Sequence, residues 1–143
     1  MAAMKRLFQL MAEKKASDIF LTVNAPINIK IGGNAMPVNQ TLLTADSVKT
    51  LLYEVLNERQ IREFEEEMEL NTAFTMEAVG TFRISAFRQK GTPAVVVRYI
   101  PSSIPNIDSL GVPEVLKEVI MQKRGLILIV GATGSGKSTT LSA

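Results

Sequence analysis

Hydrophobic and polar residues alternate along several stretches of the first hundred positions, a pattern that predicts short β-strands. Ile27, Ile29 and Ile31, for example, alternate with polar neighbours before Gly32-Gly33-Asn34 turns the chain. Glycine and proline also separate the other stretches, as expected for turns between strands. The predicted strands are 18–23, 27–31, 35–38, 72–77, 82–88 and 94–100. Short turns between neighbouring strands favour an antiparallel sheet.

Three segments of the same region carry apolar residues at helical spacing instead. An apolar face that runs from Met4 to Met11 predicts a short first helix. Thr44 is typical of the residue that caps a helix N-terminus, and Asn57 with Gln60 three residues later suits a capping box. The apolar positions that would face inward are Val48, Leu51, Leu52, Val55 and Leu56 in the second helix and Ile61, Phe64 and Met68 in the third. Helices and an antiparallel sheet together predict an α/β unit over residues 1–100.

The pattern changes after residue 100. The paired prolines of Pro101–Pro105 disfavour both helix and sheet interior, so this stretch is interpreted as a linker. Pro113 suits the start of a helix, and Gly125 its end. The run Leu126–Val130 is entirely apolar, which predicts a strand buried on both faces. A second domain therefore begins within this part of the chain.

Composition narrows the range of functions. Sixteen basic and fourteen acidic residues give a net charge of +2, and the interspersed charges argue against nucleic acid as a partner. The chain contains no cysteine and no histidine, which excludes disulfides, thiol chemistry and histidine-based acid–base catalysis. No apolar run is long enough to cross a bilayer, and the start does not suit a signal peptide, so we expect a cytoplasmic chain without direct membrane insertion. The acidic run 65–67 is interpreted as the solvated side of the third helix, with a metal ion or a basic partner as the alternative.

Two arginines in the last predicted hairpin present an electrostatic problem. A turn centred between Lys90 and Gly91 would place Arg83 directly opposite Arg98 on the same face of the sheet. Like charges in that position are destabilising, and the neighbours Ser85 and Val96 provide no carboxylate. An external phosphate would resolve the repulsion, because the arginine fork donates two hydrogen bonds to one such anion. The alternatives are that both side chains lie in solvent or pair with the acidic run 65–67.

Residues 131–138 spell the phosphate-binding motif G-x-x-x-x-G-K-[ST]. An apolar run precedes this loop, and a strand–loop–helix arrangement is the context that the motif requires. Backbone N–H groups of such a loop, together with the positive end of the helix dipole, surround a phosphate group. The predicted nucleotide-binding residues are Gly131, Ala132, Thr133, Gly134, Ser135, Gly136, Lys137, Ser138 and Thr139. A glycine-rich turn with an incidental lysine is the alternative interpretation.

The motif assigns a role to each polar group of the loop. Lys137 would contact the β- and γ-phosphate oxygens of ATP, and the amides from Gly134 to Ser138 would hold the α- and β-phosphates. Ser138 would supply a hydroxyl ligand to Mg²⁺, and Thr139 would touch the α-phosphate. ATP and Mg²⁺ are therefore the expected cofactors.

Several further motifs resemble the PilT/PilU family of type IV pilus retraction motors, within the wider secretion-ATPase superfamily. They are Ala16-Ser17-Asp18, 82–87, Val97-Arg98 with Ile100-Pro101, 110–113 and 124–141. Ala132 is similar to the PilU-like branch, because the PilT branch usually carries proline there. Ser17-Asp18 matches a family signature for which a helix-ending turn with a capping aspartate is an equally simple interpretation.

The resemblance implies a fold and an assembly. Residues 1–100 would form a PAS-like domain, residues 101–112 a linker, and residues 113–143 the beginning of a RecA-like ATPase domain. Six chains would form a ring at the cytoplasmic face of the inner membrane, with a platform protein of the pilus and a paralogous retraction ATPase as candidate partners. Arg83 and Arg98 match family arginines that reach the nucleotide phosphates when the cleft between the two domains closes.

The resemblance also implies what this chain lacks. The acidic strand that supports Mg²⁺, the catalytic base and a histidine cluster would lie beyond Ala143, so we expect the 143-residue fragment not to hydrolyse ATP. Alternatives for the whole protein are a pilus assembly or type II secretion ATPase and an unrelated phosphate-loop kinase. The fragment itself could instead be a non-catalytic PAS-like module for oligomerisation or ligand sensing.

Overall fold

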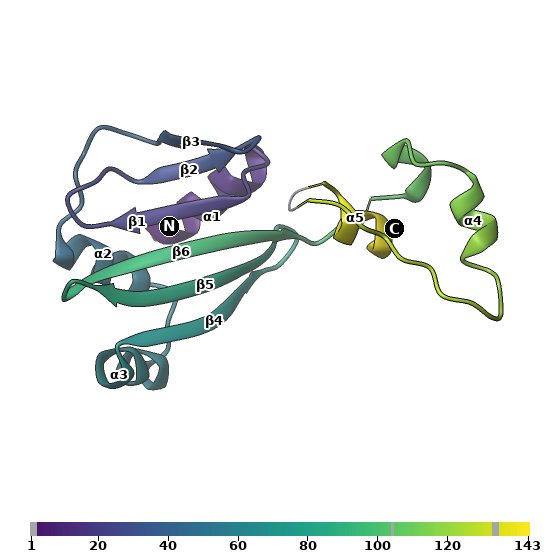
Figure 1. The fold of residues 1–143 in the computed structure, drawn as a ribbon. Helices are drawn as coiled ribbons and strands as arrows, with labels where there is room; N and C mark the ends of the chain where they lie inside the picture. Colours follow the sequence, from purple (N-terminus) through teal and green to yellow (C-terminus); the bar gives the residue numbers. More distant parts are fainter. Residues whose placement is uncertain (1–2, 104, 133–134) are drawn as a thin grey trace. The chain divides into compact units, whose positions relative to one another are not determined.

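The computed structural model describes residues 3–103, 105–132 and 135–143. Its contacts divide the chain into two compact units, Met1–Ser102 and Ser103–Ala143. Figure 1 shows the sheet and three helices of the first unit and the short helices of the second. Each unit is described by itself.

A six-stranded antiparallel sheet forms the first unit, with the strand order β3-β2-β1-β6-β5-β4. The strands are β1 (Asp18–Thr22), β2 (Asn28–Ile31), β3 (Asn34–Pro37), β4 (Glu69–Met76), β5 (Gly80–Gln89) and β6 (Thr92–Pro101). The predicted α/β class with a mainly antiparallel sheet is confirmed. The two longest strands, β5 and β6, exceed their predicted bounds because their pairing continues to both ends of the hairpin. At the hairpin turn, Lys90 and Gly91 both adopt positive φ angles, as tight two-residue hairpin turns require.

Three helices accompany the sheet: α1 (Ala3–Glu13), α2 (Ala45–Tyr53) and α3 (Glu58–Glu67). Both predicted N-caps are present as complete capping boxes, Thr44 with Ser47 and Asn57 with Gln60. α1 and α2 contact β6, and α3 contacts β4. None of the helices in the described ranges has both the length and the apolar composition needed to span a bilayer.

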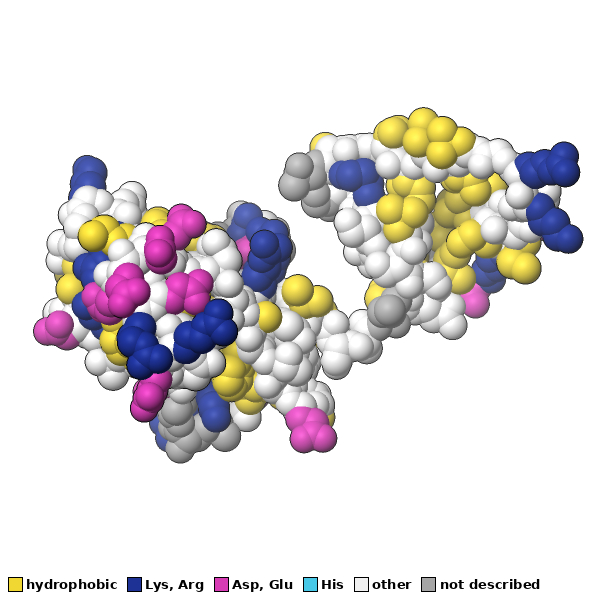
Figure 2. All heavy atoms as spheres, turned by 90° about the horizontal axis from the view of Figure 1, so that it is seen from below, with side chains coloured by type: hydrophobic (Ala, Val, Ile, Leu, Met, Phe, Trp, Pro, Cys, Tyr) yellow, Lys and Arg dark blue, Asp and Glu magenta, His cyan; other side chains and the backbone are white. Residues whose placement is uncertain are grey.

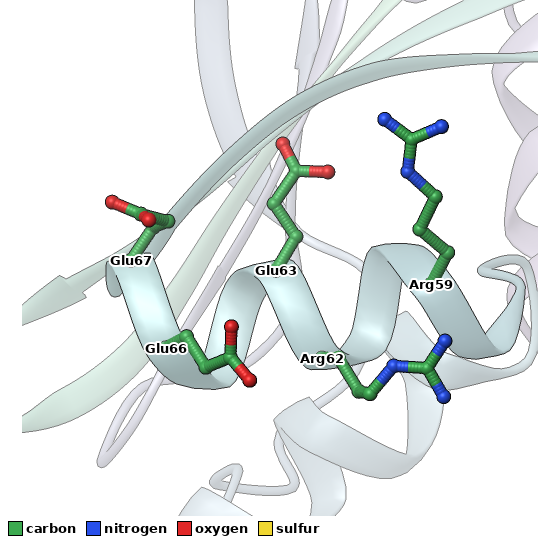
Figure 3. Close-up of a pocket in the computed structure, with 5 residues that line it drawn as sticks. All are labelled: Arg59, Arg62, Glu63, Glu66 and Glu67. Carbon is green, nitrogen blue, oxygen red and sulfur yellow. The ribbon is translucent and has the colours of Figure 1, made fainter.

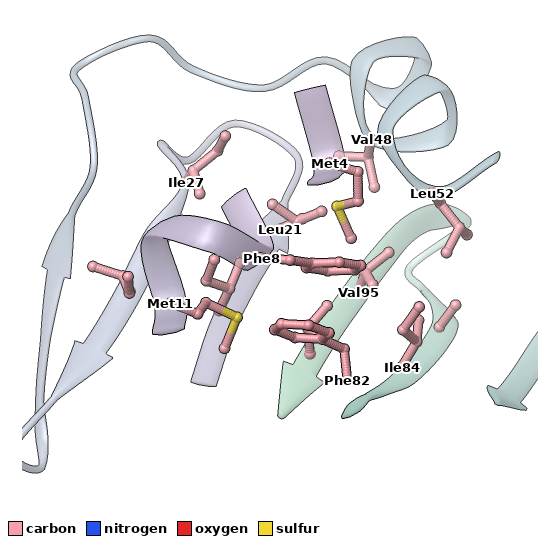
Figure 4. Packing of buried hydrophobic residues seen from close by; sticks show 14 of the residues in the cluster. Met4, Phe8, Met11, Leu21, Ile27, Val48, Leu52, Phe82, Ile84 and Val95 are labelled. Carbon is pink, nitrogen blue, oxygen red and sulfur yellow. The ribbon is translucent and has the colours of Figure 1, made fainter. Parts of the chain in front are cut away.

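The hydrophobic core lies between the helices and one face of the sheet (Figure 4). Phe8 of α1 stacks on Phe82 of β5 with the ring centroids 4.1 Å apart and nearly parallel planes. Tyr99 of β6 also stacks on Phe82, with the ring centroids 5.1 Å apart, and its hydroxyl donates a hydrogen bond to the Val79 carbonyl. Because the core takes one face of the sheet, the alternate residues of β1, β5 and β6 face away from it.

α3 carries acidic and basic side chains on its exposed side. Arg59, Glu63 and Glu67 project to one side of the helix and Arg62 and Glu66 to another (Figure 3), and they line a shallow hollow. In Figure 2, which views the molecule from the side of α3, magenta and blue side chains are interspersed over the first unit. The prediction of a solvated acidic face is thus confirmed for Glu66 and Glu67.

Glu65, in contrast, connects three elements. Its carboxylate accepts hydrogen bonds from Lys49 Nζ of α2 at 2.5 Å, from Arg88 Nη2 of β5 at 2.5 Å and from the Tyr53 hydroxyl. The hydrogen bonds from Lys49 and Tyr53 lower the pKa of Glu65. Burial, and then the bond to Glu65, raise the pKa of Tyr53 to about 12. Glu65 is therefore exposed, as predicted for the acidic run, and it also has the basic partners that were the alternative interpretation.

Replacing Glu65 with glutamine removes the charge that Lys49 and Arg88 share, and we expect a loss of about 0.5–1 kcal/mol of unfolding free energy. The carboxylate has a lower pKa in the folded state than in the unfolded state, so its contribution is present above the unfolded value and is lost as the pH falls through the folded value. Denaturant unfolding at neutral pH and in acid well below the usual pKa of glutamate measures both effects. The variant should differ from the parent at neutral pH and converge with it in acid. An equal difference at both pH values would contradict this account.

The second unit contains little regular structure. It has a 3₁₀ turn at Ile107–Leu110 and two short helices, α4 (Val115–Val119) and α5 (Lys137–Ser142). The predicted buried strand at Leu126–Val130 is wrong, since these residues adopt no strand conformation and Leu126 and Val130 are more than 80% exposed, at 82% and 83%. A strand needs a neighbour for its backbone N–H and C=O groups, and none of the described strands pairs with this segment. Hydrophobic side chains consequently lie at the surface of this unit (Figure 2).

Candidate functional site

The phosphate-loop motif ends at the start of α5. Gly136 caps this helix with φ 91°, a left-handed conformation that favours glycine, and Lys137 is the first helical residue. A hollow of about 200 Å³ is lined by Gly136, Lys137, Ser138 and Thr139. The first N–H groups of a helix have no partner within it, so the amides at this point are free to donate to a ligand.

The loop before the helix folds back on itself. The Lys137 ammonium group donates a hydrogen bond to the Ala132 carbonyl at 2.7 Å, and the Ser135 amide donates to the same carbonyl at 3.2 Å. Gly131 has a φ of 157°, which side chains rarely adopt, and a Cβ there would lie 2.7 Å from Ser135 Oγ, so another residue would be strained at this position. The predicted nucleotide contacts at Thr133 and Gly134 fall outside the described residues.

The hydroxyl groups of α5 divide into two sets. Thr140 and Ser142 donate to the carbonyls of Gly136 and Ser138 one turn earlier, which occupies them within the helix. The side chains of Ser138 and Thr139 are exposed and line the hollow beside Lys137. The structure therefore brings together an ammonium group, two hydroxyl groups and glycine-rich backbone, a donor set that suits a phosphate group with an oxygen-seeking cation.

The second predicted group of site residues lies on the sheet of the first unit. Arg83 of β5 and Arg98 of β6 are directly opposite each other, as the predicted register requires. Both side chains face away from the core and are exposed. They line a hollow of about 330 Å³ together with Asn71, Ser85 and Val96. Ser85 Oγ donates to Asn71 Oδ1 at 2.7 Å, so the polar groups available to a ligand here are mainly the guanidinium and amide N–H donors.

The sequence interpretation missed the carboxylate beside this pair. Asp18 of β1 lies opposite Arg98, and its Oδ1 accepts a hydrogen bond from Arg98 Nε at 3.1 Å. Ser85 and Val96 provide no carboxylate, as expected, but β1 pairs with β6 and supplies Asp18 to Arg98 from 80 residues away in the chain. The alternative that the arginines pair with the acidic run is wrong, since Glu65 pairs with Arg88 instead.

Arg83 lacks, among the described residues, the carboxylate partner that Arg98 has. Within the described ranges it takes part in no salt bridge, whereas Arg98 has Asp18. Lys30 of β2 lies opposite Asp18 on the other side, so one row across the sheet reads Lys30, Asp18, Arg98, Arg83. Three basic groups and one acid in this row leave an excess of positive charge on the open face of the sheet.

The interpretation of Ser17-Asp18 as a capping turn is likewise corrected. Asp18 is the first residue of β1, and its carboxylate bonds to Arg98. Ser17 fixes that position through its backbone, because its N–H donates to the Lys30 carbonyl and its carbonyl accepts from the Tyr99 N–H. The signal available in the sequence was the alternation itself, which places Asp18 on the face opposite Ile19 and Leu21.

The chain is similar to known ATPases of type IV pili. PilU, the type IV pilus ATPase of Pseudomonas aeruginosa, is 42% identical over 139 residues, which cover 97% of this chain and 36% of PilU. The retraction ATPase PilT of the same organism is 39% identical over 137 residues, covering 96% of this chain and 40% of PilT. A crystal structure of the pilus retraction motor PilT with bound ADP is 36% identical, covers 99% of this chain and 41% of that one, and has a TM-score of 0.76.

These matches extend over almost the whole chain but not over the whole of each relative. The chain spans 36% of the length of PilU and 40% of the length of PilT. The profile of the family described as "Type II/IV secretion system protein" matches residues 2–143. This chain therefore belongs to the type II/IV secretion system protein family, in its PilT/PilU group.

Proposed function

We propose that this chain is part of a motor ATPase that powers retraction of type IV pili. The observation that carries the proposal is the phosphate loop, with Lys137 at the first position of α5 and glycine-rich backbone before it. The similarity to PilU and PilT supports pilus retraction as the process that the ATPase drives. ADP bound to the PilT motor supports a nucleotide as the ligand.

Each loop residue has a role in the proposal. Lys137 releases the Ala132 carbonyl and contacts the β- and γ-phosphate oxygens, and the amides between Gly134 and Ser138 hold the α- and β-phosphates. Gly131, Ala132, Thr133 and Gly136 shape the loop, and Thr139 contacts the α-phosphate. Ser138 provides an exposed hydroxyl ligand for Mg²⁺, an ion that neutralises charge on the transferring phosphoryl group. Such sites act by positioning and by electrostatic stabilisation.

The arginine pair of the first unit is a separate part of the proposal. Arg83 and Arg98 sense the nucleotide phosphates from the sheet, because a phosphate relieves the repulsion between two guanidinium groups placed directly opposite each other. In this proposal residues 1–100 form a PAS-like domain, 101–112 a linker and 113–143 the beginning of a RecA-like domain. ATP binding and hydrolysis then drive movement of the PAS-like domain.

The proposed assembly follows the PilT/PilU group. Six copies form a ring at the cytoplasmic face of the inner membrane, where the ring acts on the platform protein of the pilus and works beside a paralogous retraction ATPase. The proposal needs an arginine pair outside the core, and the exposure of Arg83 and Arg98 beside a common hollow supports it.

ATP hydrolysis provides the test of this proposal. We expect Mg²⁺-dependent ATP hydrolysis from a protein that carries this chain together with the remainder of the family's ATPase domain, and none from the 143-residue chain alone. The physical reason is that the hollow at the loop is lined by Gly136, Lys137, Ser138 and Thr139, without a carboxylate to activate water. A phosphate-release assay compares the two proteins at equal concentration. Steady turnover by the 143-residue chain, or none by the longer protein, would contradict the proposal.

A further inference from the structure

Asp18 is a nearly buried carboxylate at the edge of an otherwise positive surface. Its residue is 6% exposed, whereas the Arg98 side chain that it contacts is 68% exposed. Burial of a charged group is costly unless the group is paired and hydrogen-bonded. Arg98 is the one salt-bridge partner of Asp18 within the described part of the chain.

The hydrogen bond to Asp18 leaves the terminal Nη groups of Arg98 available to a ligand. Asp18 Oδ1 accepts from Nε, the donor on the stem side of the guanidinium group. The two Nη groups, which carry the remaining four donors, donate no hydrogen bond within the described residues. They belong to a side chain that lines the hollow of about 330 Å³ with Arg83 and Asn71.

We infer that Asp18 is a positioning residue that holds the Arg98 guanidinium by its Nε edge, so that the Nη groups of Arg98 and the whole fork of Arg83 meet at one phosphate. This inference rests on the proposed function and adds to it the residue that orients the sensing pair. A free arginine side chain loses considerable rotamer entropy when it binds an anion. An arginine already held by a buried carboxylate loses less, so binding is tighter than the net charge alone predicts.

A simpler role for Asp18 makes the opposite prediction. If Asp18 only reduced the positive charge of the surface, its neutralisation would strengthen the attraction for an anion. If it orients Arg98, its neutralisation weakens anion binding although the surface becomes more positive. The sign of the change therefore separates the two roles.

The experiment titrates inorganic pyrophosphate into the 143-residue chain and follows the side-chain Nε–Hε signals of Arg83 and Arg98 by NMR. The parent should show shifts of both signals, and Asp18→Asn should weaken binding at this face roughly fivefold or more. Glu69→Gln is the matched control. Glu69 is an exposed carboxylate of β4 on the same face of the sheet as Arg83, and it forms no salt bridge within the described residues. It should leave the affinity unchanged or slightly raised.

Two variants of Arg98 test whether Asp18 acts through this arginine. Arg98→Lys retains the positive charge but loses Nε, so it should weaken binding about as much as Asp18→Asn, which matters if the latter fails to fold. In an Arg98→Ala background, Asp18→Asn should have no further effect, because Asp18 acts through Arg98. Tighter binding in Asp18→Asn, an equal loss in the Arg98→Ala background, or no response of the parent signals would each overturn the inference.

Failure of the proposed function has a different signature. If Lys137→Ala leaves nucleotide binding intact while the arginine signals respond as expected, the phosphate loop is not the nucleotide site, and Asp18 still orients an anion-binding pair. If Lys137→Ala abolishes nucleotide binding while Asp18→Asn has no effect, the proposed function survives and the inference fails.

Discussion

Replacing Lys137 with alanine should lower the affinity for MgATP by roughly 10- to 100-fold, the largest functional effect that we expect from a single substitution. Hydrogen bonds to charged groups contribute about 1.5–3 kcal/mol, and each 1.4 kcal/mol corresponds to a tenfold change in affinity. The Lys137 ammonium group lies in the hollow with Ser138 and Thr139 and bonds to a backbone carbonyl that a phosphate oxygen can replace. Isothermal titration calorimetry of the 143-residue chain measures this affinity.

The control for Lys137→Ala is Lys123→Ala. Lys123 is an exposed lysine of the same unit that forms no salt bridge within the described residues, so its removal changes the net charge equally without touching the loop. We expect parent-like affinity from this variant. Equal losses in the two variants would mean that a general charge effect, rather than the loop, holds the nucleotide.

Replacing Phe82 with alanine should have the largest effect on stability, a loss of about 3–5 kcal/mol of unfolding free energy. Phe82 is fully buried in the core of the first unit, where its ring stacks on the rings of Phe8 and Tyr99. Truncation removes both stacking contacts and leaves a cavity that β5, paired on both sides, cannot close. Because domains of this size have a total stability of about 5–15 kcal/mol, we expect a large decrease in the midpoint of denaturant unfolding.

Phe20→Ala provides the comparison for Phe82→Ala. Phe20 is a half-buried phenylalanine of β1 on the open face of the sheet, opposite Val96. It loses a ring of the same size but leaves no closed cavity, so its cost should be less than half of that at Phe82. Similar losses at the two positions would show that the core is not organised around the aromatic stack.

The arginine pair shows what the sequence could predict. An even-numbered turn between Lys90 and Gly91 fixes the register of a hairpin by local geometry alone, and the structure places Arg83 opposite Arg98 accordingly. The capping boxes at Thr44 and Asn57 were predictable for the same reason, since a cap depends on residues only three positions apart. The glycine-rich motif of the loop is equally local.

Asp18 shows what the sequence could not predict. Its contact with Arg98 depends on the pairing of β1 with β6, strands separated by the whole of β2 to β5 in the chain. No local pattern states which strands become neighbours in a sheet. The segment Leu126–Val130 is the opposite case, in which a local pattern predicted a strand that does not form. An apolar run forms a strand only where another strand is present to pair with it. Its exposed side chains follow from the absence of such a partner among the described strands.

The central claim is that the loop ending at Ser138 holds the phosphates of a nucleotide. Backbone amide NMR of the 143-residue chain during titration with MgADP tests this claim most directly, because each N–H group reports its own surroundings. The account predicts that the largest shifts occur at the amides of Gly136, Lys137, Ser138 and Thr139 and that they disappear in Lys137→Ala. Saturable binding of MgADP that leaves these four amides unchanged would contradict it.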